Sequence, residues 1–408
     1  MPRFLHTADW QIGRQYGRFA PEDATVLAEA RFAAVERIAA LAAQERVDAV
    51  LVAGDVFDAQ TVSDRTIRRL FNALRAFAGP WILIPGNHDA ALAESVWTRA
   101  QRLDAVPPGV CLLLEPGVRV FPESGFAVLA APLTRRQTHE DLTAWFDAAQ
   151  TPAGLARIGL AHGSVQGILA EDIDSPNPIQ NDRARCARLD YLALGDWHGF
   201  KQIDAHTVYS GTPEPERFRD NGSGRVVRVV VSGPGQVPEV EPLAVGHYRW
   251  LAWHERLAVA SDLDLLVERL DGLPPETVLD LTLTGAIDLV GERRLDRALS
   301  VLQGRCRSLQ VHRAGLRLEP TVEDLAALRA DGYVGEVIAQ LRQRQAVANG
   351  TVGPENPTDA RTMAAATDQA HAADTAHAAD DQADTAREAL AILAGLLEAQ
   401  STGPEKGP

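Results

Sequence analysis

The sequence lacks any apolar run long enough to cross a membrane: none of its 408 residues lies in a stretch of about 18 uncharged apolar residues. Its N-terminal segment has no apolar core typical of a secretory signal peptide. The three cysteines, Cys111, Cys186 and Cys306, are far apart and form no CxxC pair, which argues against a disulfide framework or a zinc knuckle. These absences predict a cytoplasmic protein without a membrane anchor.

Lysine is almost absent too, so nearly every cation is arginine, and the formal net charge is −15. Nucleic-acid-binding proteins are usually basic, so this charge counts against tight DNA binding without metal ions. Residues 346–408 contain ten acidic and three basic residues, a net −7, which leaves −8 of the −15 for the first 345 residues. Metal ions among carboxylates would reverse the local field, and arginine binds phosphate with two parallel hydrogen bonds. The composition therefore still allows a phosphate-containing substrate.

Apolar runs of strand length alternate with stretches of helical spacing over about the first 200 residues. The predicted strands are Val47–Val52, Trp81–Ile84, Ile158–Ala161 and Tyr191–Leu194, and the predicted helices are Pro21–Arg46 and Ser63–Phe77. Hydrophobic residues make up 46% of the chain, enough for a large core. The alternation predicts an α/β layered domain over residues 1–240.

Three further segments are predicted after this domain. Residues 241–345 alternate strands and helices as a small α+β capping domain, and no cluster of His, Asp and Asn suggests chemistry there. Residues 346–386 are rich in Ala, Thr, Asp and Gly, which predicts a disordered linker. Residues 387–400 form a short amphipathic helix that is marginal alone, so it either folds back on its own chain or docks on a partner.

Polar side chains suited to metal binding follow five apolar runs, each where the run ends. The five clusters are Asp9 and Gln11; Asp55 and Asp58; Asn87, His88 and Asp89; His162; and Asp196 and His198. In α/β sheets, functional groups collect beyond the carboxyl ends of strands. A polar loop explains one such cluster easily, but five of them predict one shared site.

The residue types narrow the chemistry of this site. Oxygen donors mixed with imidazole suit Mn, Fe, Zn or Mg better than a metal that prefers thiolate. About seven ligands are too many for one ion, and Asp55 can bridge two ions with its two oxygens. Two ions roughly 3.5–4 Å apart clamp a phosphate and acidify a bridging water. The sequence therefore predicts two divalent metal ions that hydrolyse phosphate esters.

The motifs also resemble a known family. GDVFD at Gly54–Asp58 and GNHD at Gly86–Asp89 resemble signatures of the calcineurin-like metallophosphoesterases, and His162–Gly163 and Gly195–His198 occupy the fourth and fifth signature places. HTADWQIG, LDYLALGDWHGFKQ and TVYSGTPEPERF further resemble segments of SbcD-type DNA repair nucleases. The resemblance covers about residues 1–340. It implies a metallophosphoesterase-type β-sandwich flanked by helices, and a manganese-dependent nuclease that acts on DNA as a homodimer with an SbcC-type coiled-coil ATPase.

The resemblance also implies residue roles. The first ion would be bound by Asp9, Asp55 and His198, and the second by Asp55, Asn87 and His162. His88 would protonate the leaving oxygen or stabilise developing charge, with Asp89 as its orienting partner. Asp58 would support a ligand or its loop.

Two ligand positions depart from the family pattern. The opening motif normally reads Asp-x-His but here ends in Gln11, and the last normally reads Gly-His-x-His but here contains Asp196. Gln11 is a weak neutral ligand, and Asp196 is an anionic ligand harder than imidazole. The changes either shift the site towards Mg or Mn or weaken metal binding enough to silence it.

Substrate contacts are predicted beside the first and last ligand loops. Arg14 and Tyr16 follow the first loop and could touch a phosphate backbone or stack on a base. Trp197 adjoins the last ligand and either stacks on substrate or forms a wall of the site. A solvated surface loop is the alternative for the first two.

Three functions remain open at this point. The first is a DNA exonuclease or endonuclease subunit of a complex with an ATPase, which the linker and terminal helix favour. The second is a phosphoesterase for a small nucleotide or a phosphoprotein, which the acidic charge favours. The third is a non-catalytic binding subunit, weakened by Gln11 and Asp196.

Overall fold

A computed structural model describes residues 1–168, 176–321, 323–324, 333–348, 385–386, 388–393 and 396. The chain divides into two compact units, Met1–Leu251 and Ala252–Pro408. The boundary predicted after residue 240 falls within strand β14 (Glu239–Ala244), which pairs with β13 (Arg225–Val230) in the first unit. The first unit therefore extends to Leu251. Residues 349–384 of the predicted linker and most of the predicted terminal helix lie outside the described residues.

Two six-stranded sheets form the first unit. One has the order β14-β13-β1-β2-β3-β4, and the other β11-β12-β10-β7-β6-β5. Their remaining strands are β1 (Arg3–Thr7), β2 (Ala49–Ala53), β3 (Trp81–Ile84), β4 (Val110–Leu112), β5 (Gly117–Phe121), β6 (Phe126–Ala131), β7 (Ala156–His162), β10 (Tyr191–Gly195), β11 (Lys201–Gln202) and β12 (Thr207–Tyr209). Strands β1 to β4 are parallel, as are β6, β7, β10 and β12. The carboxyl ends of the central strands therefore meet at one edge of each sheet.

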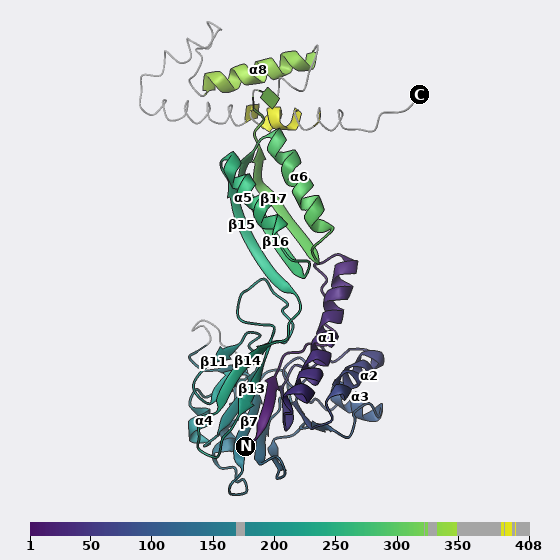
Figure 1. Ribbon diagram of the computed structural model, residues 1–408, viewed down its shortest axis with the longest axis vertical. Helices are drawn as coiled ribbons and strands as arrows, with labels where there is room; N and C mark the ends of the chain where they lie inside the picture. Colours follow the sequence, from purple (N-terminus) through teal and green to yellow (C-terminus); the bar gives the residue numbers. More distant parts are fainter. Residues whose placement is uncertain are drawn as a thin grey trace. The chain divides into compact units, whose positions relative to one another are not determined.

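Helices cover the outer faces of this sandwich (Figure 1). Helices α1 (Pro21–Glu45), α2 (Asp64–Ala73) and α3 (Val96–Arg102) pack on the first sheet. The short segments η2 (Ala144–Asp147) and α4 (Arg183–Cys186) pack on the second. The layers are thus helix, sheet, sheet, helix, which confirms the predicted α/β sandwich flanked by helices.

The sequence of β2 shows why it reads as one continuous apolar run. Its residues Val50 and Val52 pack towards the helices, whereas Leu51 packs in the core between the sheets. A strand covered on both faces needs apolar residues at every position rather than at alternate ones. Helix α2 is capped as its sequence predicts, because the Ser63 hydroxyl accepts a hydrogen bond from the Thr66 amide at 3.1 Å.

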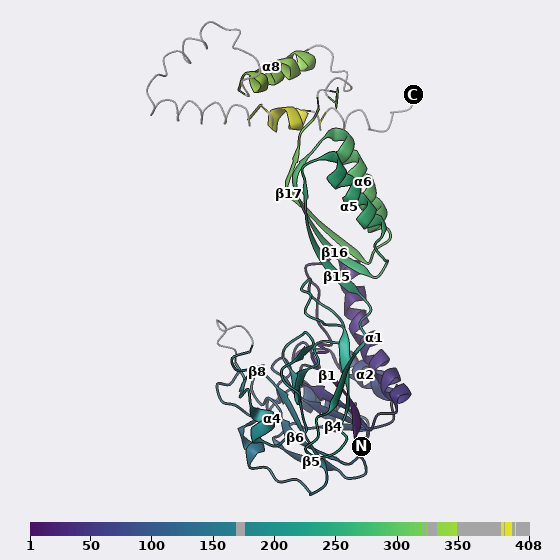
Figure 2. The same ribbon diagram turned by 60° about the vertical axis from the view of Figure 1, so that its left-hand side comes forward.

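The second unit contains a three-stranded sheet of order β15-β16-β17 with two helices (Figure 2). The elements follow the chain as β15 (Arg249–Leu257), α5 (Ala260–Asp271), β16 (Thr277–Ile287), α6 (Leu289–Gln303) and β17 (Ser308–Leu318). Helix α6 connects the parallel strands β16 and β17. Leucines of α5 and α6, such as Leu266 and Leu299, are buried.

Near the chain's end, one residue of the predicted terminal helix packs on its own chain. Leu390 is 3% exposed and lies in a cluster with Leu289 and with Ile338 of α8 (Tyr333–Ala348). Ile392 and Leu396, in contrast, are more than half exposed. The longest described helix, α1, has 25 residues, and none of the described helices is both long and apolar enough to cross a membrane.

Candidate metal centre

Loops from both sheets converge at the carboxyl ends of β1, β2, β3, β7 and β10. The ligand atoms of Asp9, Asp55 and His162 all lie within 4.8 Å of one another. His162 Nε2 lies 2.9 Å from Asn87 Oδ1 and 3.8 Å from Asp196 Oδ1. The Asp196 amide donates to Asp9 Oδ1 at 3.1 Å. The structure thus brings predicted ligands from all five loops into one site.

Several of these residues have backbone conformations that only glycine adopts easily. Asp9, Gln11, Asp55 and Asp196 have φ angles of 52°, 44°, 51° and 101°. Backbone hydrogen bonds hold the first two loops together, from the Asp9 amide to the Gly54 carbonyl at 3.0 Å and from the Gln11 amide to the Asp55 carbonyl at 2.9 Å. Such strain persists where surrounding contacts enforce it, and it is common at functional sites.

Gly86 is required by the close packing of the centre. A Cβ atom at this position would lie 2.2 Å from Asp55 Oδ1 and 2.8 Å from His162 Cε1. Any side chain there would displace one of the two ligands. The glycine of the GNHD motif therefore leaves space for a carboxylate and an imidazole from two different sheets.

The electrostatics of the centre favour a bound cation. Burial raises the pKa of Asp9 to about 6, although His198 and His162 act in the opposite direction. Burial lowers the pKa of His162, but the carboxylates of Asp55, Asp9 and Asp196 outweigh it and raise this pKa to about 9. Among the described residues, no lysine or arginine forms an ion pair with these three aspartates. Carboxylate, amide and imidazole donors with excess negative charge fit divalent cations such as Mn²⁺, Mg²⁺, Fe²⁺ or Zn²⁺.

Metal affinity is expected to fall as the pH falls. Binding requires His162 and Asp9 without their protons, and the metal-free protein holds these protons below about pH 9 and about pH 6. We expect the apparent Mn²⁺ affinity to drop about tenfold per pH unit below about pH 9, and more steeply below about pH 6. Calorimetric titration with Mn²⁺ across this range measures the slope. A pH-independent affinity would show that neither group binds the ion.

Gln11 does not present a free oxygen to the centre. Its Oε1 accepts a hydrogen bond from Arg14, and its Nε2 lies 3.3 Å from His198 Nε2. Arg14 also contacts Asp58 Oδ1 at 3.3 Å. The oxygen predicted to bind the first ion is therefore held by a guanidinium in this structure.

His88 and Asp89 have different environments. The His88 side chain is 39% exposed, and its Nδ1 lies 2.8 Å from the Asp58 carbonyl oxygen. Its Nε2 lies 3.9 Å from Asp55 Oδ2. Asp89 is fully buried, and its two oxygens accept from the Gly86 and Phe57 amides at 2.7 and 3.0 Å. The orienting contact on His88 thus comes from Asp58, whereas Asp89 ties the β3 loop to the β2 loop.

The predicted substrate-contacting residues separate into two groups. Tyr16 is only 5% exposed, and its hydroxyl accepts a hydrogen bond from Arg31 Nε at 2.9 Å, so it cannot stack on a base. Arg14 is one quarter exposed beside the centre. Trp197 is half-buried, with Lys201 Nζ and Arg219 Cζ at 5.7 and 5.6 Å from its ring centroid. A half-buried ring flanked by two cations remains a surface that a phosphate-containing substrate could contact.

The sequence reasoning missed one prominent residue, Glu216. Its side chain is 2% exposed, and its Oε1 lies 2.5 Å from Nδ1 of the ligand candidate His198. Its Oε2 accepts from the buried Arg31 at 2.5 Å. Arg31 lies four residues from both Leu27 and Val35, hence on the apolar face of α1. A charged residue on that face was the available signal that a buried partner exists.

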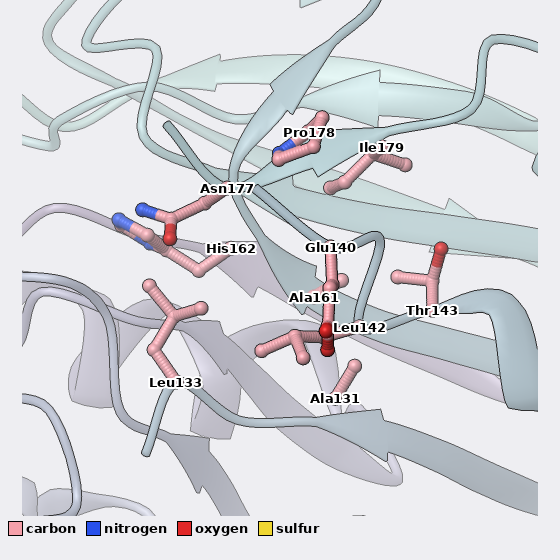
Figure 3. A pocket seen from close by; sticks show the side chains of 10 residues that line it. All are labelled: Ala131, Leu133, Glu140, Leu142, Thr143, Ala161, His162, Asn177, Pro178 and Ile179. Atoms are coloured by element: carbon pink, nitrogen blue, oxygen red, sulfur yellow. The ribbon is translucent and has the colours of Figure 1, made fainter. Parts of the chain in front are cut away.

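A small pocket lies behind His162 (Figure 3). It encloses about 190 Å³ and has His162 and Asn177 at one end, with Glu140 and Thr143 towards the other. Small-molecule sites usually measure roughly 300–1,000 Å³. The Asn177 carboxamide is engaged with the backbone, accepting from the Thr138 amide at 3.0 Å. The pocket therefore does not offer room for a nucleotide.

The layered fold and the shared centre define a metallophosphoesterase, and sequence comparison agrees. Residues 2–233 match the family described as calcineurin-like phosphoesterase. The chain therefore belongs to this family, and the class predicted from its motifs, the metal-dependent phosphoesterases, is confirmed.

Individual relatives are more distant. The chain is 26% identical over 235 residues to the uncharacterised metallophosphoesterase YhaO of Bacillus subtilis, a match that covers 54% of this chain and 55% of YhaO. It is 27% identical over 277 residues to the SbcD subunit of nuclease SbcCD from the same organism, covering 57% and 67%. It is 28% identical over 260 residues to the DNA double-strand break repair protein Mre11 of Aeropyrum pernix, covering 59% and 60%. The matched segment thus spans between about half and two thirds of these relatives.

Proposed function

We propose that the chain is a two-metal-dependent phosphodiesterase that acts on DNA, as the nuclease subunit of an SbcCD-like repair complex. The observation that carries this proposal is the convergence of ligand candidates from five loops, with Asp9, Asp55 and His162 at its centre. The relatives named as the SbcD subunit of nuclease SbcCD and as Mre11 support DNA as the substrate class. Manganese is our first choice of metal, followed by Mg, Fe or Zn.

In this proposal, each side chain has a defined task. Asp9, Asp55 and His198 would hold one ion, and Asp55, Asn87 and His162 the other, with Asp196 as an additional anionic ligand. Bound cations would neutralise phosphate charge and lower the pKa of water. His88, with one imidazole nitrogen fixed by the Asp58 carbonyl, has its Nε2 free to donate to the leaving oxygen. Arg14 and Trp197 would contact the substrate beside the ligands.

The partners follow from the relatives rather than from this chain's geometry. A protein that resembles SbcD would work with an SbcC-type coiled-coil ATPase in the cytoplasm, as a homodimer. The exposed Ile392 and Leu396, next to the packed Leu390, leave apolar surface near the chain's end for such a partner. Copurification with an ATPase encoded by a neighbouring gene tests this part.

One assay separates the candidate functions. The full chain is incubated with Mn²⁺ and single-stranded DNA, duplex DNA or bis(p-nitrophenyl) phosphate, and its metal content is measured. We expect two ions per chain and cleavage of DNA. Hydrolysis of the small ester without any DNA cleavage would favour a small nucleotide or phosphoprotein as substrate. Fewer than two ions and no turnover would favour a non-catalytic binding subunit.

Replacing Gln11 by His tests the departure from the family pattern. The amide of Gln11 binds Arg14 and His198 in this structure, whereas an imidazole would add a donor to the first ion. We expect Gln11→His to raise Mn²⁺ affinity about tenfold or more, measured by calorimetric titration. Lys201→Ala, away from this contact, is the control and should leave the affinity unchanged. A lower affinity in Gln11→His would mean that Gln11 belongs to a differently built site.

A further inference from the structure

Glu216 lies behind the metal centre and contacts the imidazole edge of His198 that faces away from it. The carboxylate is 2% exposed, and its Oε1 is 2.5 Å from His198 Nδ1. The opposite nitrogen, His198 Nε2, lies on the side of Gln11, at 3.3 Å from that side chain. A carboxylate can only accept a hydrogen bond, so it requires a proton on Nδ1. In the neutral imidazole, Nε2 then has a free lone pair.

Two arginines fix the second oxygen of Glu216. Arg31, which is 1% exposed, donates to Oε2 at 2.5 Å, and Arg14 Nε lies 3.2 Å from the same oxygen. Arg31 is itself held by the Trp10 carbonyl at 2.7 Å and by the Tyr16 hydroxyl at 2.9 Å. The carboxylate is therefore anchored on one side by helix α1 and the first ligand loop, and it meets His198 on the other side.

We propose that Glu216 is a positioning residue that keeps the proton of His198 on Nδ1 and so directs Nε2 to the metal. This role rests on the proposed function in that it takes His198 as a metal ligand. A carboxylate behind a ligating histidine fixes the tautomer and ring orientation, and its loss usually costs about 10- to 100-fold in metal affinity. Glu216 would link α1 and the segment after β12 to the first ion, although it touches neither metal nor substrate.

Glu216→Gln gives the sharpest test, because a carboxamide has only one accepting oxygen. Arg31 and Arg14 would attract that oxygen, which leaves the NH₂ group facing His198 Nδ1. The imidazole proton should then move to Nε2, the nitrogen that would bind metal. We expect nitrogen NMR of the metal-free protein, at a pH at which His198 is neutral, to show this exchange of tautomer. Mn²⁺ affinity should fall about 10- to 100-fold.

Glu214→Gln is the matched control. Glu214 is also buried, but it pairs with Arg37 at 2.8 Å and accepts from the amides of His247 and Tyr248, without contact to His198. It should change neither the tautomer nor Mn²⁺ affinity. A double variant of Glu216→Gln with His198→Ala should bind Mn²⁺ no more weakly than His198→Ala alone, because Glu216 acts through His198.

The outcomes separate this inference from the proposed function. Unchanged tautomer and Mn²⁺ affinity in Glu216→Gln, with a wild-type protein that binds two ions, would overturn the positioning role alone. The expected tautomer change in a wild-type protein that binds no Mn²⁺ would support the role and overturn the metal centre. If Glu216→Gln does not fold, Glu216→Asp keeps a carboxylate for Arg31 but withdraws it from His198, and the same loss of affinity is expected.

Discussion

Replacing Asp55 by Asn is expected to abolish metal binding and phosphodiester hydrolysis together. Asp55 is 2% exposed at the middle of the centre, with Oδ1 3.6 Å from His162 Nε2 and Oδ2 3.9 Å from His88 Nε2. It is the carboxylate proposed to be shared by both ions, so the amide removes one negative charge and one anionic oxygen from each. We expect metal content below one ion per chain and a loss of hydrolysis of about 1,000-fold or more.

The control for this variant lies at the other end of the same strand. Asp48 immediately precedes β2, and its Oδ2 accepts a hydrogen bond from the Arg3 amide at 2.7 Å, remote from the ligands. Asp48→Asn should keep both metal ions and full activity. Metal content and the rate with bis(p-nitrophenyl) phosphate are measured on both variants. If Asp55→Asn retained two ions and normal turnover, the shared-ligand role would be wrong.

The strand ends and their polar loops could be predicted from sequence because both signals are local. Buried strands such as β2 and β3 are continuous apolar runs, and Asp55 and Asn87 follow them within a few residues. Parallel pairing then brings the loops together, whatever the details of side-chain packing. The fold class needed only this periodicity.

Contacts between distant segments could not be predicted in the same way. Glu216 meets Arg31 across 185 positions of sequence, and no local pattern reports such a pair. Tyr16 follows the first ligand loop closely, yet its ring packs against Trp250, which fixes it in the core instead of on the surface. The orientation of Gln11 likewise depends on Arg14 and on His198 from the other sheet.

The domain boundary was misplaced for a physical reason. The Gly-Pro-Gly after β13 marks a turn, and the sequence reading ended the first domain soon after it. In the structure, that turn leads into β14, which pairs with β13 at the edge of the first sheet. Turn residues report a change of chain direction, but they do not tell whether the next strand returns to the same sheet.

Replacing His88 by Ala is expected to stop turnover while leaving the metal ions in place. The side chain is 39% exposed, and its Nε2 is 3.9 Å from Asp55 Oδ2, so it borders the centre without being enclosed by it. The backbone amide of His88 donates to Asp55 Oδ1 at 2.9 Å, and this contact survives in the variant. General acid catalysis contributes about 100- to 10,000-fold, so DNA cleavage should fall by that factor.

His206→Ala is the control, because its Nδ1 also contacts a backbone carbonyl, that of Asp190, at 2.9 Å, but just before β12 and away from the ligands. It should keep wild-type rates and metal content. Loss of metal in His88→Ala alone would identify His88 as a ligand and not as a proton donor.

The leaving group decides between the two roles proposed for His88. The oxygen expelled from DNA is strongly basic and needs a proton, whereas p-nitrophenolate leaves without one. If Nε2 donates that proton, His88→Ala should lose much more activity on DNA than on bis(p-nitrophenyl) phosphate. If the imidazole instead stabilises charge on the phosphoryl oxygens, both substrates should lose activity by similar factors. The position of Nε2 beside Asp55, with Nδ1 fixed by Asp58, favours the first outcome.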